Sequence, residues 1–248
     1  MSVAALGWVV ERLAGDAVQV TVVLPRGANA HTFEPTWETA RALDDAAVFA
    51  RVGHPGLPFE SSALAVLPAG GRGPALVDVA AGEDLRKDDP HVWLSPRRMG
   101  GFADRLAAAL ADLHVLEPAA LEQRRRALHT EIDALDAELA ARLARHRGRA
   151  LFVAHPAFGA FAAEYGLRQD ALERDHKEPD PRALLETIEW ARRAGVRALV
   201  VQPGFPRDVA ALVASELGAR VVTVDPLAPD WPATLRAVAG AFDESYPG

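Results

Sequence analysis

The chain has 248 residues, half of them hydrophobic, which is enough to bury the core of one large domain or of two lobes. Its formal net charge of -7 argues against a protein that wraps nucleic acid or binds an anionic membrane surface, because both partners favour a basic face. Cysteine is absent, which excludes disulfides, thiolate metal sites and thiol catalysis, so any metal must be held by His, Asp or Glu.

The first residues have the spacing of an amphipathic helix. Val3, Leu6, Val10 and Leu13 recur every three or four positions within residues 1–16. This segment lacks the basic start and apolar run of an export signal, and no other apolar run approaches the roughly 20 residues that span a bilayer. The printed chain is therefore expected to carry no signal peptide and no membrane span.

Runs rich in β-branched residues alternate with helical patterns along most of the chain. The runs that predict strands are residues 18–24, 46–52, 74–79, 149–155, 196–203 and 219–226. Between them Ser95, followed by Pro96, has the pattern of a helix start. Strands that alternate with helices predict an α/β fold of parallel sheets flanked by helices.

The middle of the chain predicts one long helix over residues 118–146. This segment has no glycine and no internal proline after Pro118, and its leucines and Ile132 fall on one face. At 1.5 Å per residue the helix would extend roughly 40 Å, more than a crossover within one small lobe needs. We expect an N-terminal α/β lobe over 1–116, a linking helix over 117–147 and a C-terminal α/β lobe over 148–248; packing along a single domain is the alternative.

Four side chains with metal-binding chemistry stand just after strand-like runs or just before a helix start. They are His31, His91, His155 and Asp225. Open α/β sheets bind ligands beyond the carboxyl ends of their strands, so these residues can converge through the fold although they are far apart in sequence. Three imidazoles and one carboxylate suit tetrahedral Zn²⁺.

Each of these histidines taken alone is more typical of a satisfied or solvated imidazole, so the hypothesis depends on their equivalent places. Four protein ligands would close the coordination sphere and favour binding, and the sequence has no HExxH, GxxxxGK[ST], GxSxG or GxGxxG motif. We therefore expect no catalytic residues. If Asp225 instead orients a water molecule, the three histidines would describe a zinc hydrolase.

The remaining histidines have less specific surroundings. His54 follows a strand-like run, and its Pro and Gly neighbours fit either a residue near the site or a simple turn. His176 is expected to be solvated or capping. The histidines of helical and helix-end segments, expected at the surface, are His114, His129 and His146. Asp88 and Asp89 either orient the second ring nitrogen of His91 or belong to a solvated turn.

Several segments together resemble the metal-binding solute-binding proteins of ABC importers, particularly the zinc-uptake type. The segment LPRGANAHTFEPT resembles the first ligand loop of that family, DPHVWLSP the second, FVAHPAFGAFAAEYGL the third and VVTVDPLA the fourth. The resemblance implies two α/β lobes joined by a long rigid helix, with a metal bound between them. By position, His31, His91, His155 and Asp225 would be the ligands.

The same resemblance implies a role and a location. We expect a high-affinity Zn²⁺ carrier, not an enzyme, that is monomeric, periplasmic or lipid-anchored outside the cytoplasm, and that delivers zinc to a membrane permease. Manganese is the alternative ion, but manganese-type members tend to carry Glu where His155 stands, which favours zinc. A metal-dependent adhesin is a further alternative. The histidine-rich loop of many zinc-type members has no counterpart, since residues 67–89 contain no histidine.

Overall fold

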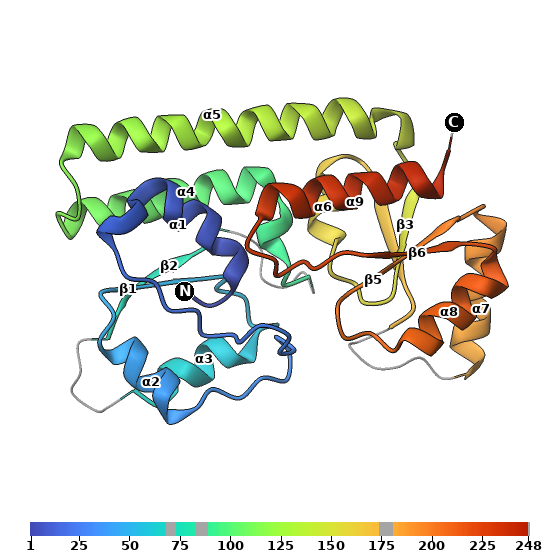
Figure 1. Ribbon diagram of the computed structural model, residues 1–248, viewed down its shortest axis with the longest axis horizontal. Coiled ribbons are helices and arrows are strands. Elements are labelled where there is room, and N and C mark those ends of the chain that lie inside the picture. Colours follow the sequence, from blue (N-terminus) through green and yellow to red (C-terminus); the bar gives the residue numbers. More distant parts are fainter. Residues whose placement is uncertain (68–72, 83–88, 174–180, 248) are drawn as a thin grey trace. The chain divides into compact units, whose positions relative to one another are not determined.

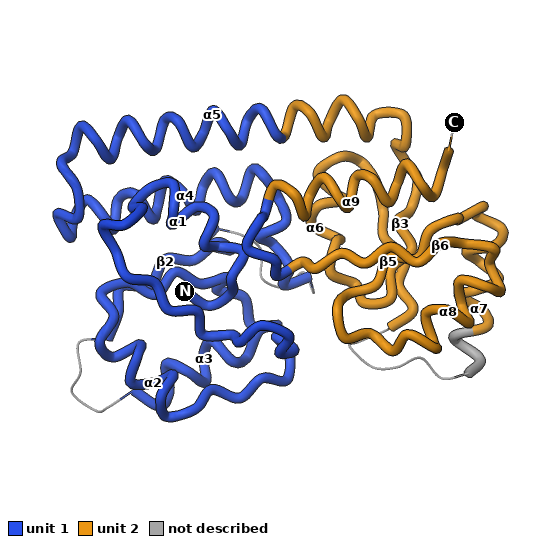
Figure 2. The backbone as a smooth tube through the Cα atoms, in the orientation of Figure 1, with its two compact units in different colours: residues 1–135, 227–231 blue, residues 136–226, 232–248 orange. Residues whose placement is uncertain are grey.

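The computed structural model describes residues 1–67, 73–82, 89–173 and 181–247 (Figure 1). The chain divides into two compact units (Figure 2). Unit 1 consists of residues 1–135 and 227–231, and unit 2 of residues 136–226 and 232–248. The sequence-based boundaries after residues 116 and 147 stay a prediction.

Unit 1 contains a parallel pair of strands with helices around it. Its elements are η1 (Ala4–Leu6), α1 (Gly7–Ala14), η2 (Gly15–Ala17), α2 (Trp37–Asp44), β1 (Val48–Arg51), α3 (Pro58–Ala65), β2 (Ala75–Asp78), η3 (Val92–Leu94), α4 (Pro96–Asp112) and the first part of α5 (Pro118–Leu143). Strands β1 and β2 pair in parallel with Val48 opposite Ala75. As predicted, α4 begins after Ser95, whose side chain accepts a hydrogen bond from the Arg98 backbone N–H.

The predicted strand over residues 18–24 is wrong. The chain leaves η2 through an extended Val18, and the segment pairs with the first two residues: Thr21 O accepts from the amino group of Met1, Val23 N–H donates to Met1 O and Leu24 N–H donates to Ser2 O. Ser2 N–H in turn donates to Ala50 O of β1. β-Branched composition alone does not make a strand, because a strand also needs another strand to pair with.

The core of unit 1 joins distant parts of the chain through aromatic side chains. The rings of Trp8 in α1 and Trp231 at the start of α9 (Trp231–Ser245) lie 5.1 Å apart. The indole N–H of Trp231 donates to the backbone oxygen of Trp93 at 2.8 Å. All three tryptophans are buried, with at most 6% of their surface exposed, so the residues that follow His91 belong to a packed core.

The long helix α5 has the apolar face that the sequence predicts. It spans 26 residues and continues into the 3₁₀ turn η4 (Ala144–His146). The side chains of its buried face are Leu121, Leu128, Ile132, Leu135, Leu139 and Leu143, none more than 4% exposed. The division between the two units falls within this helix, after Leu135, so each unit buries one part of the same face.

Unit 2 is a parallel sheet with helices packed against it. Its elements are the rest of α5, η4, β3 (Ala150–Val153), α6 (Gly159–Glu164), β4 (Arg168–Ala171), α7 (Pro181–Arg193), β5 (Ala198–Val201), α8 (Arg207–Leu217), β6 (Arg220–Thr223) and α9. The strand order is β4-β3-β5-β6, all pairs parallel. The two central strands, β3 and β5, are buried along their whole length, as expected for a sheet covered on both faces.

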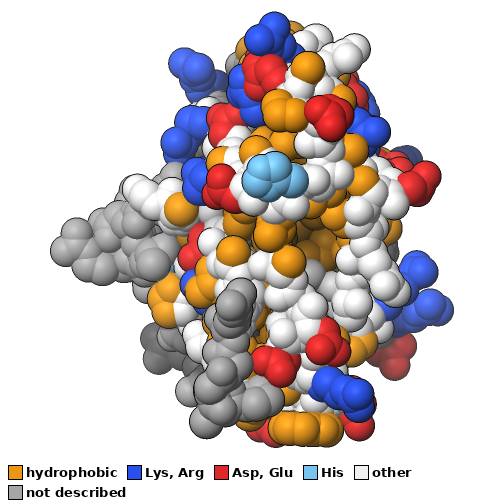
Figure 3. All heavy atoms as spheres, turned by 90° about the vertical axis from the view of Figure 1, so that its left-hand side faces the viewer, with side chains coloured by type: hydrophobic (Ala, Val, Ile, Leu, Met, Phe, Trp, Pro, Cys, Tyr) orange, Lys and Arg blue, Asp and Glu red, His pale blue; other side chains and the backbone are white. Residues whose placement is uncertain are grey.

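These features confirm the predicted α/β class with parallel sheets, helices on their faces and one long helix in the middle of the chain. Strand β4 was not predicted, because its sequence RQDA has no β-branched residue. Within the described ranges, no helix is both long and apolar enough to cross a membrane. On the face of the molecule in Figure 3, acidic and basic side chains are interspersed.

Candidate metal-binding site

His31 lies in the loop between residue 24 and α2, and two hydrogen bonds fix its backbone and its ring. Its backbone N–H donates to Asn29 Oδ1 at 2.8 Å, which closes a side-chain turn over two residues. Its ring nitrogen Nδ1 lies 3.0 Å from the backbone oxygen of Gly56. A carbonyl oxygen only accepts hydrogen bonds, so Nδ1 carries the proton and the lone pair of neutral His31 is on Nε2.

His91 is held in the same manner by one carboxylate. Both its backbone N–H and its ring Nδ1 lie 2.9 Å from Asp89 Oδ1. The imidazole is only 3% exposed and stacks at an angle on Trp93, with ring centroids 5.2 Å apart. Because an ionised carboxylate only accepts, the lone pair of neutral His91 is again on Nε2. Asp89 thus has the predicted orienting contact, whereas Asp88 lies outside the described residues.

Unit 1 brings these two imidazoles together. The ring centroids of His31 and His91 are 5.4 Å apart, and the ring planes meet at 68°. A pair of neutral imidazoles with fixed tautomers is a chelating arrangement for a divalent cation.

His155 stands at the carboxyl edge of the sheet in unit 2. Strand β3 ends at Val153, and backbone pairing continues to Ala154, whose oxygen accepts from Glu173 N–H. The ring Nδ1 of His155 lies 2.7 Å from Glu173 Oε2. Glu173 comes just after the neighbouring strand β4, so parallel pairing places the histidine and its carboxylate partner side by side.

Glu173 also belongs to an acidic cavity of about 400 Å³ in unit 2. Asp170 and Glu186 line the same cavity. Burial raises the pKa of Asp170, which indicates a carboxyl group that water solvates incompletely. Negative charge beside His155 stabilises a cation bound to that ring.

Asp225 follows β6 at the same edge of the sheet. It is half-buried, and its backbone oxygen accepts from the Thr234 hydroxyl at 3.3 Å. In the strand order β4-β3-β5-β6, β6 is two strands from β3, so roughly 10 Å separates the two strand axes.

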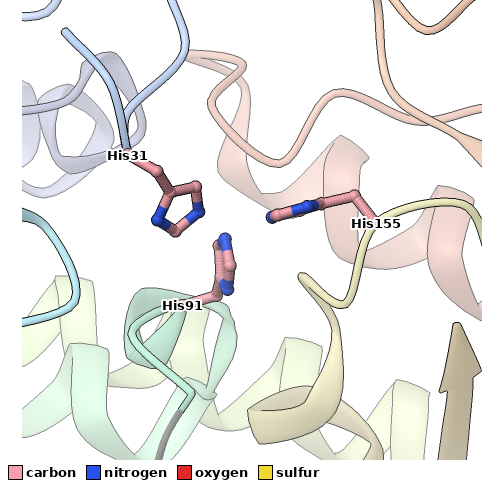
Figure 4. A group of neighbouring side chains, drawn as sticks. All are labelled: His31, His91 and His155. Atoms are coloured by element: carbon pink, nitrogen blue, oxygen red, sulfur yellow. The ribbon is translucent and has the colours of Figure 1, made fainter. Parts of the chain in front are cut away.

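Among the described residues, the candidate ligand set for a metal ion contains His31 and His91 from unit 1 and His155 from unit 2 (Figure 4). Asp225 is not part of that set. The four-ligand assignment therefore stays a prediction. Sequence reasoning missed two groups that orient the rings, Gly56 and Glu173, and one that fixes the backbone at His31, Asn29.

The other histidines differ in burial. His114 is exposed and the side chain of His129 is partly exposed, as expected. The expectation for His146 is wrong, because its side chain is 3% exposed and its Nε2 lies 2.8 Å from Asp243 Oδ1. The 3₁₀ turn at the end of α5 directs it inward. His176 lies outside the described residues.

Comparison with known proteins decides the family. The model of the family described as "Zinc-uptake complex component A periplasmic" matches residues 1–244. The chain belongs to this family. It is therefore a metal-binding solute-binding protein and not an enzyme, which removes the hydrolase alternative.

Solved structures and curated relatives agree with this assignment. A crystal structure of ZnuA is 31% identical, with a TM-score of 0.89, over 98% of this chain and 96% of that one. A ZnuA deletion mutant with zinc bound is 29% identical, with a TM-score of 0.85, over 100% and 97%. The zinc-binding lipoprotein AdcA of Streptococcus pneumoniae is 23% identical over 88% of this chain and 47% of its own length.

Proposed function

We propose that this zinc-uptake family protein binds Zn²⁺ through His31, His91, His155 and Asp225 and delivers it to an ABC-type permease. One observation supports the ligand assignment above all others. In each of the three histidines, Nδ1 is hydrogen-bonded to an oxygen acceptor: Gly56 O, Asp89 Oδ1 and Glu173 Oε2 respectively. Metal-binding histidines use their second nitrogen in this way, since the hydrogen bond fixes the ring and makes the other nitrogen the donor.

The chemistry of the donors favours zinc. Three neutral imidazoles and one carboxylate match the coordination number and ligand types of tetrahedral Zn²⁺. Manganese, the alternative ion, is better served by carboxylate, carbonyl and water oxygens. The ZnuA relative with bound zinc supports the same choice.

The role of carrier follows from reversible binding. Neutral nitrogens and one carboxylate give a site of low net charge that can release its ion without a chemical reaction. A protein with this role acts outside the cytoplasm, in a periplasm or on a lipid anchor, as a monomer that meets a membrane permease. The family description and the lipoprotein relative support this location.

Native mass spectrometry of chelator-stripped protein, titrated with Zn²⁺ and Mn²⁺, tests the assignment. We expect one zinc per chain, and weaker binding by at least about 100-fold in His155→Ala and in Asp225→Ala, since each removes a ligand rather than a supporting group, whose loss typically costs 10–100-fold. His114→Ala, an exposed histidine, is the matched control and should bind as the parent does.

Two results would overturn parts of the proposal. A parent protein without stoichiometric metal contradicts metal binding altogether. Undiminished zinc affinity in Asp225→Ala, together with loss in His155→Ala, contradicts the four-ligand site.

A further inference from the structure

A turn between β1 and α3 joins the surroundings of both histidines in unit 1. Within this turn, Leu57 N–H donates to His54 O at 3.0 Å. The ring Nδ1 of His54 accepts a second hydrogen bond, from Gly56 N–H at 3.0 Å. His54 is only 7% exposed, so its ring is a fixed part of the turn.

The geometry of one peptide unit connects this turn to His31. The peptide between Gly56 and Leu57 has its N–H bound to His54 O, and its carbonyl oxygen accepts from His31 Nδ1 at 3.0 Å. In a trans peptide the N–H and the C=O point in opposite directions. Fixing the N–H inside the turn therefore aims the carbonyl outward at the His31 ring.

Packing limits how far Gly56 can move. A Cβ atom built on Gly56 would lie 3.1 Å from His54 Nδ1 and 3.0 Å from Pro90 Cβ. Gly56 thus sits tightly between the His54 ring and the residue that precedes His91. The same turn contacts the loops of both unit 1 histidines.

The start of the turn is anchored by buried groups. The carboxylate of Glu60, 1% exposed, accepts from Val52 N–H and from Gly53 N–H, each at 2.8 Å. Gly53 has a φ of 77°, and a Cβ there would lie 2.6 Å from Asp78 Cγ, so this position requires glycine. The chain consequently enters the turn in one conformation.

We infer that His54 is a positioning residue of the metal site: it holds Gly56 so that the Gly56 carbonyl fixes the ring and tautomer of His31. This inference rests on the proposed metal binding by His31. It also assigns His54 a role other than that of ligand, because a ring whose Nδ1 accepts a hydrogen bond carries its proton on Nε2.

Paired substitutions separate positioning from general stability. Asn in place of His54 can accept from the N–H two residues ahead, as Asn29 and Asp89 do for His31 and His91. We expect His54→Ala to weaken zinc binding about 10- to 100-fold, the usual effect of losing a group that orients a ligand, and His54→Asn to restore most of it. His114→Asn is the matched control at an exposed histidine.

A measurement without metal tests the same role. Long-range ¹H–¹⁵N NMR at pH 8 on the chelator-stripped protein reports which nitrogen of His31 is protonated. The parent and His54→Asn should show the Nδ1–H form of His31, and His54→Ala should show a mixture of both tautomers. Far-UV circular dichroism of each variant establishes that it is folded.

The outcomes separate this inference from the proposed function. Parent-like zinc affinity and a parent-like His31 tautomer in His54→Ala would overturn the inference. Equal losses of zinc affinity in His54→Ala and His54→Asn would also overturn it, because restoring an acceptor for the Gly56 N–H would then have no effect on binding. If His54→Ala changes the His31 tautomer but the parent chain binds no zinc, the result supports positioning by His54 and contradicts metal binding.

Discussion

The two units orient their histidines by different means. In unit 1, local turns fix the main chain at both histidines. Asn29 accepts a hydrogen bond from the backbone N–H of His31, and Asp89 accepts one from the backbone N–H of His91. In unit 2, His155 depends on strand order, because its partner Glu173 comes from the adjacent strand β4. Short-range turns therefore shape one half of the proposed site, and sheet topology shapes the other.

This difference has consequences for the free protein. Unit 1 presents two imidazoles whose ring centroids are 5.4 Å apart, and hydrogen bonds within that unit fix both rings. Unit 2 presents one imidazole beside a carboxylate-lined cavity. Unit 1 thus holds two of the three histidines of the candidate set, and unit 2 holds one, which lies beside several carboxyl groups.

The largest expected effect is on pH dependence, where unit 1 should account for two protons and unit 2 for one. Imidazole ordinarily titrates near pH 6.5, and protons compete with the metal, so zinc affinity falls as the pH falls. Between pH 7.5 and 5.5 we expect zinc affinity to fall with a limiting slope of about 10-fold per pH unit for each histidine that must lose a proton to bind. Isothermal titration calorimetry, corrected for buffer ionisation, measures this slope, and a flat profile would contradict three histidine ligands.

The ion pairs around Asp243 should stay intact over this pH range. Burial alone would raise the pKa of Asp243, but hydrogen bonds from Arg145, His146 and Arg142 lower it to about 2. A carboxyl with a lowered pKa stabilises the fold above its ordinary value of 3.8, and that contribution disappears only as the pH falls toward 2. Circular dichroism at pH 5.5 and at pH 7.5 checks that the protein is folded at both ends of the titration.

The next effect concerns the carboxylates that orient two of the rings. Asp89→Asn and Glu173→Gln keep an oxygen acceptor but remove its charge, so each should weaken zinc binding about 10-fold. Asp89→Ala should cost more than Asp89→Asn, because it also removes the acceptor for the His91 backbone. Competition with a chromophoric chelator measures all three variants. Equal losses of zinc affinity in Asp89→Asn and Asp89→Ala would show that the hydrogen bond to the His91 backbone does not contribute to binding.

The smallest effect is expected from the ion pairs that tie α5 to each unit. Arg12 pairs with Glu131 in unit 1, and Arg236 with Glu138 in unit 2, both at 2.7 Å and both substantially exposed. Exposed pairs contribute about 0.2–1 kcal/mol, so Arg12→Ala and Arg236→Ala should change the free energy of unfolding by that little and leave zinc affinity unchanged. Urea denaturation with double-mutant cycles measures the coupling free energy of each ion pair. A coupling above about 1 kcal/mol for only one of them would show that the two units hold α5 with different strength.

The sequence was informative where composition and spacing act locally. β-Branched runs located β1, β2, β3, β5 and β6, and the spacing of apolar residues located α5. Positions at or just after strand-like runs singled out His31 and His155, and a position just before a helix start singled out His91. The role of Asp89 could also be predicted from the sequence, since an Asp side chain commonly accepts a hydrogen bond from the backbone N–H two residues ahead.

What the sequence did not predict depends on pairing between distant segments. Glu173 was missed because β4 has no β-branched residue, so nothing in the sequence placed it beside His155. The Gly56 carbonyl was missed because main-chain acceptors leave no trace in composition. Asn29 had a readable signal, as it stands two positions before His31, just as Asp89 stands before His91.

The acceptor that orients the His31 ring is a backbone oxygen, whereas the acceptors for His91 and His155 are side-chain oxygens. Asp89 and Glu173 are side chains, so one codon change can delete either of them. Every amino acid has a backbone carbonyl, so no substitution at position 56 can delete the oxygen that receives the His31 proton. Genetic variation can only displace this oxygen by reshaping the turn. A Cβ at position 56 would press on His54 Nδ1 and Pro90 Cβ, so the orientation of His31 is sensitive to the shape of this turn, through substitutions at positions 54 and 56 and through insertions or deletions between residues 53 and 57.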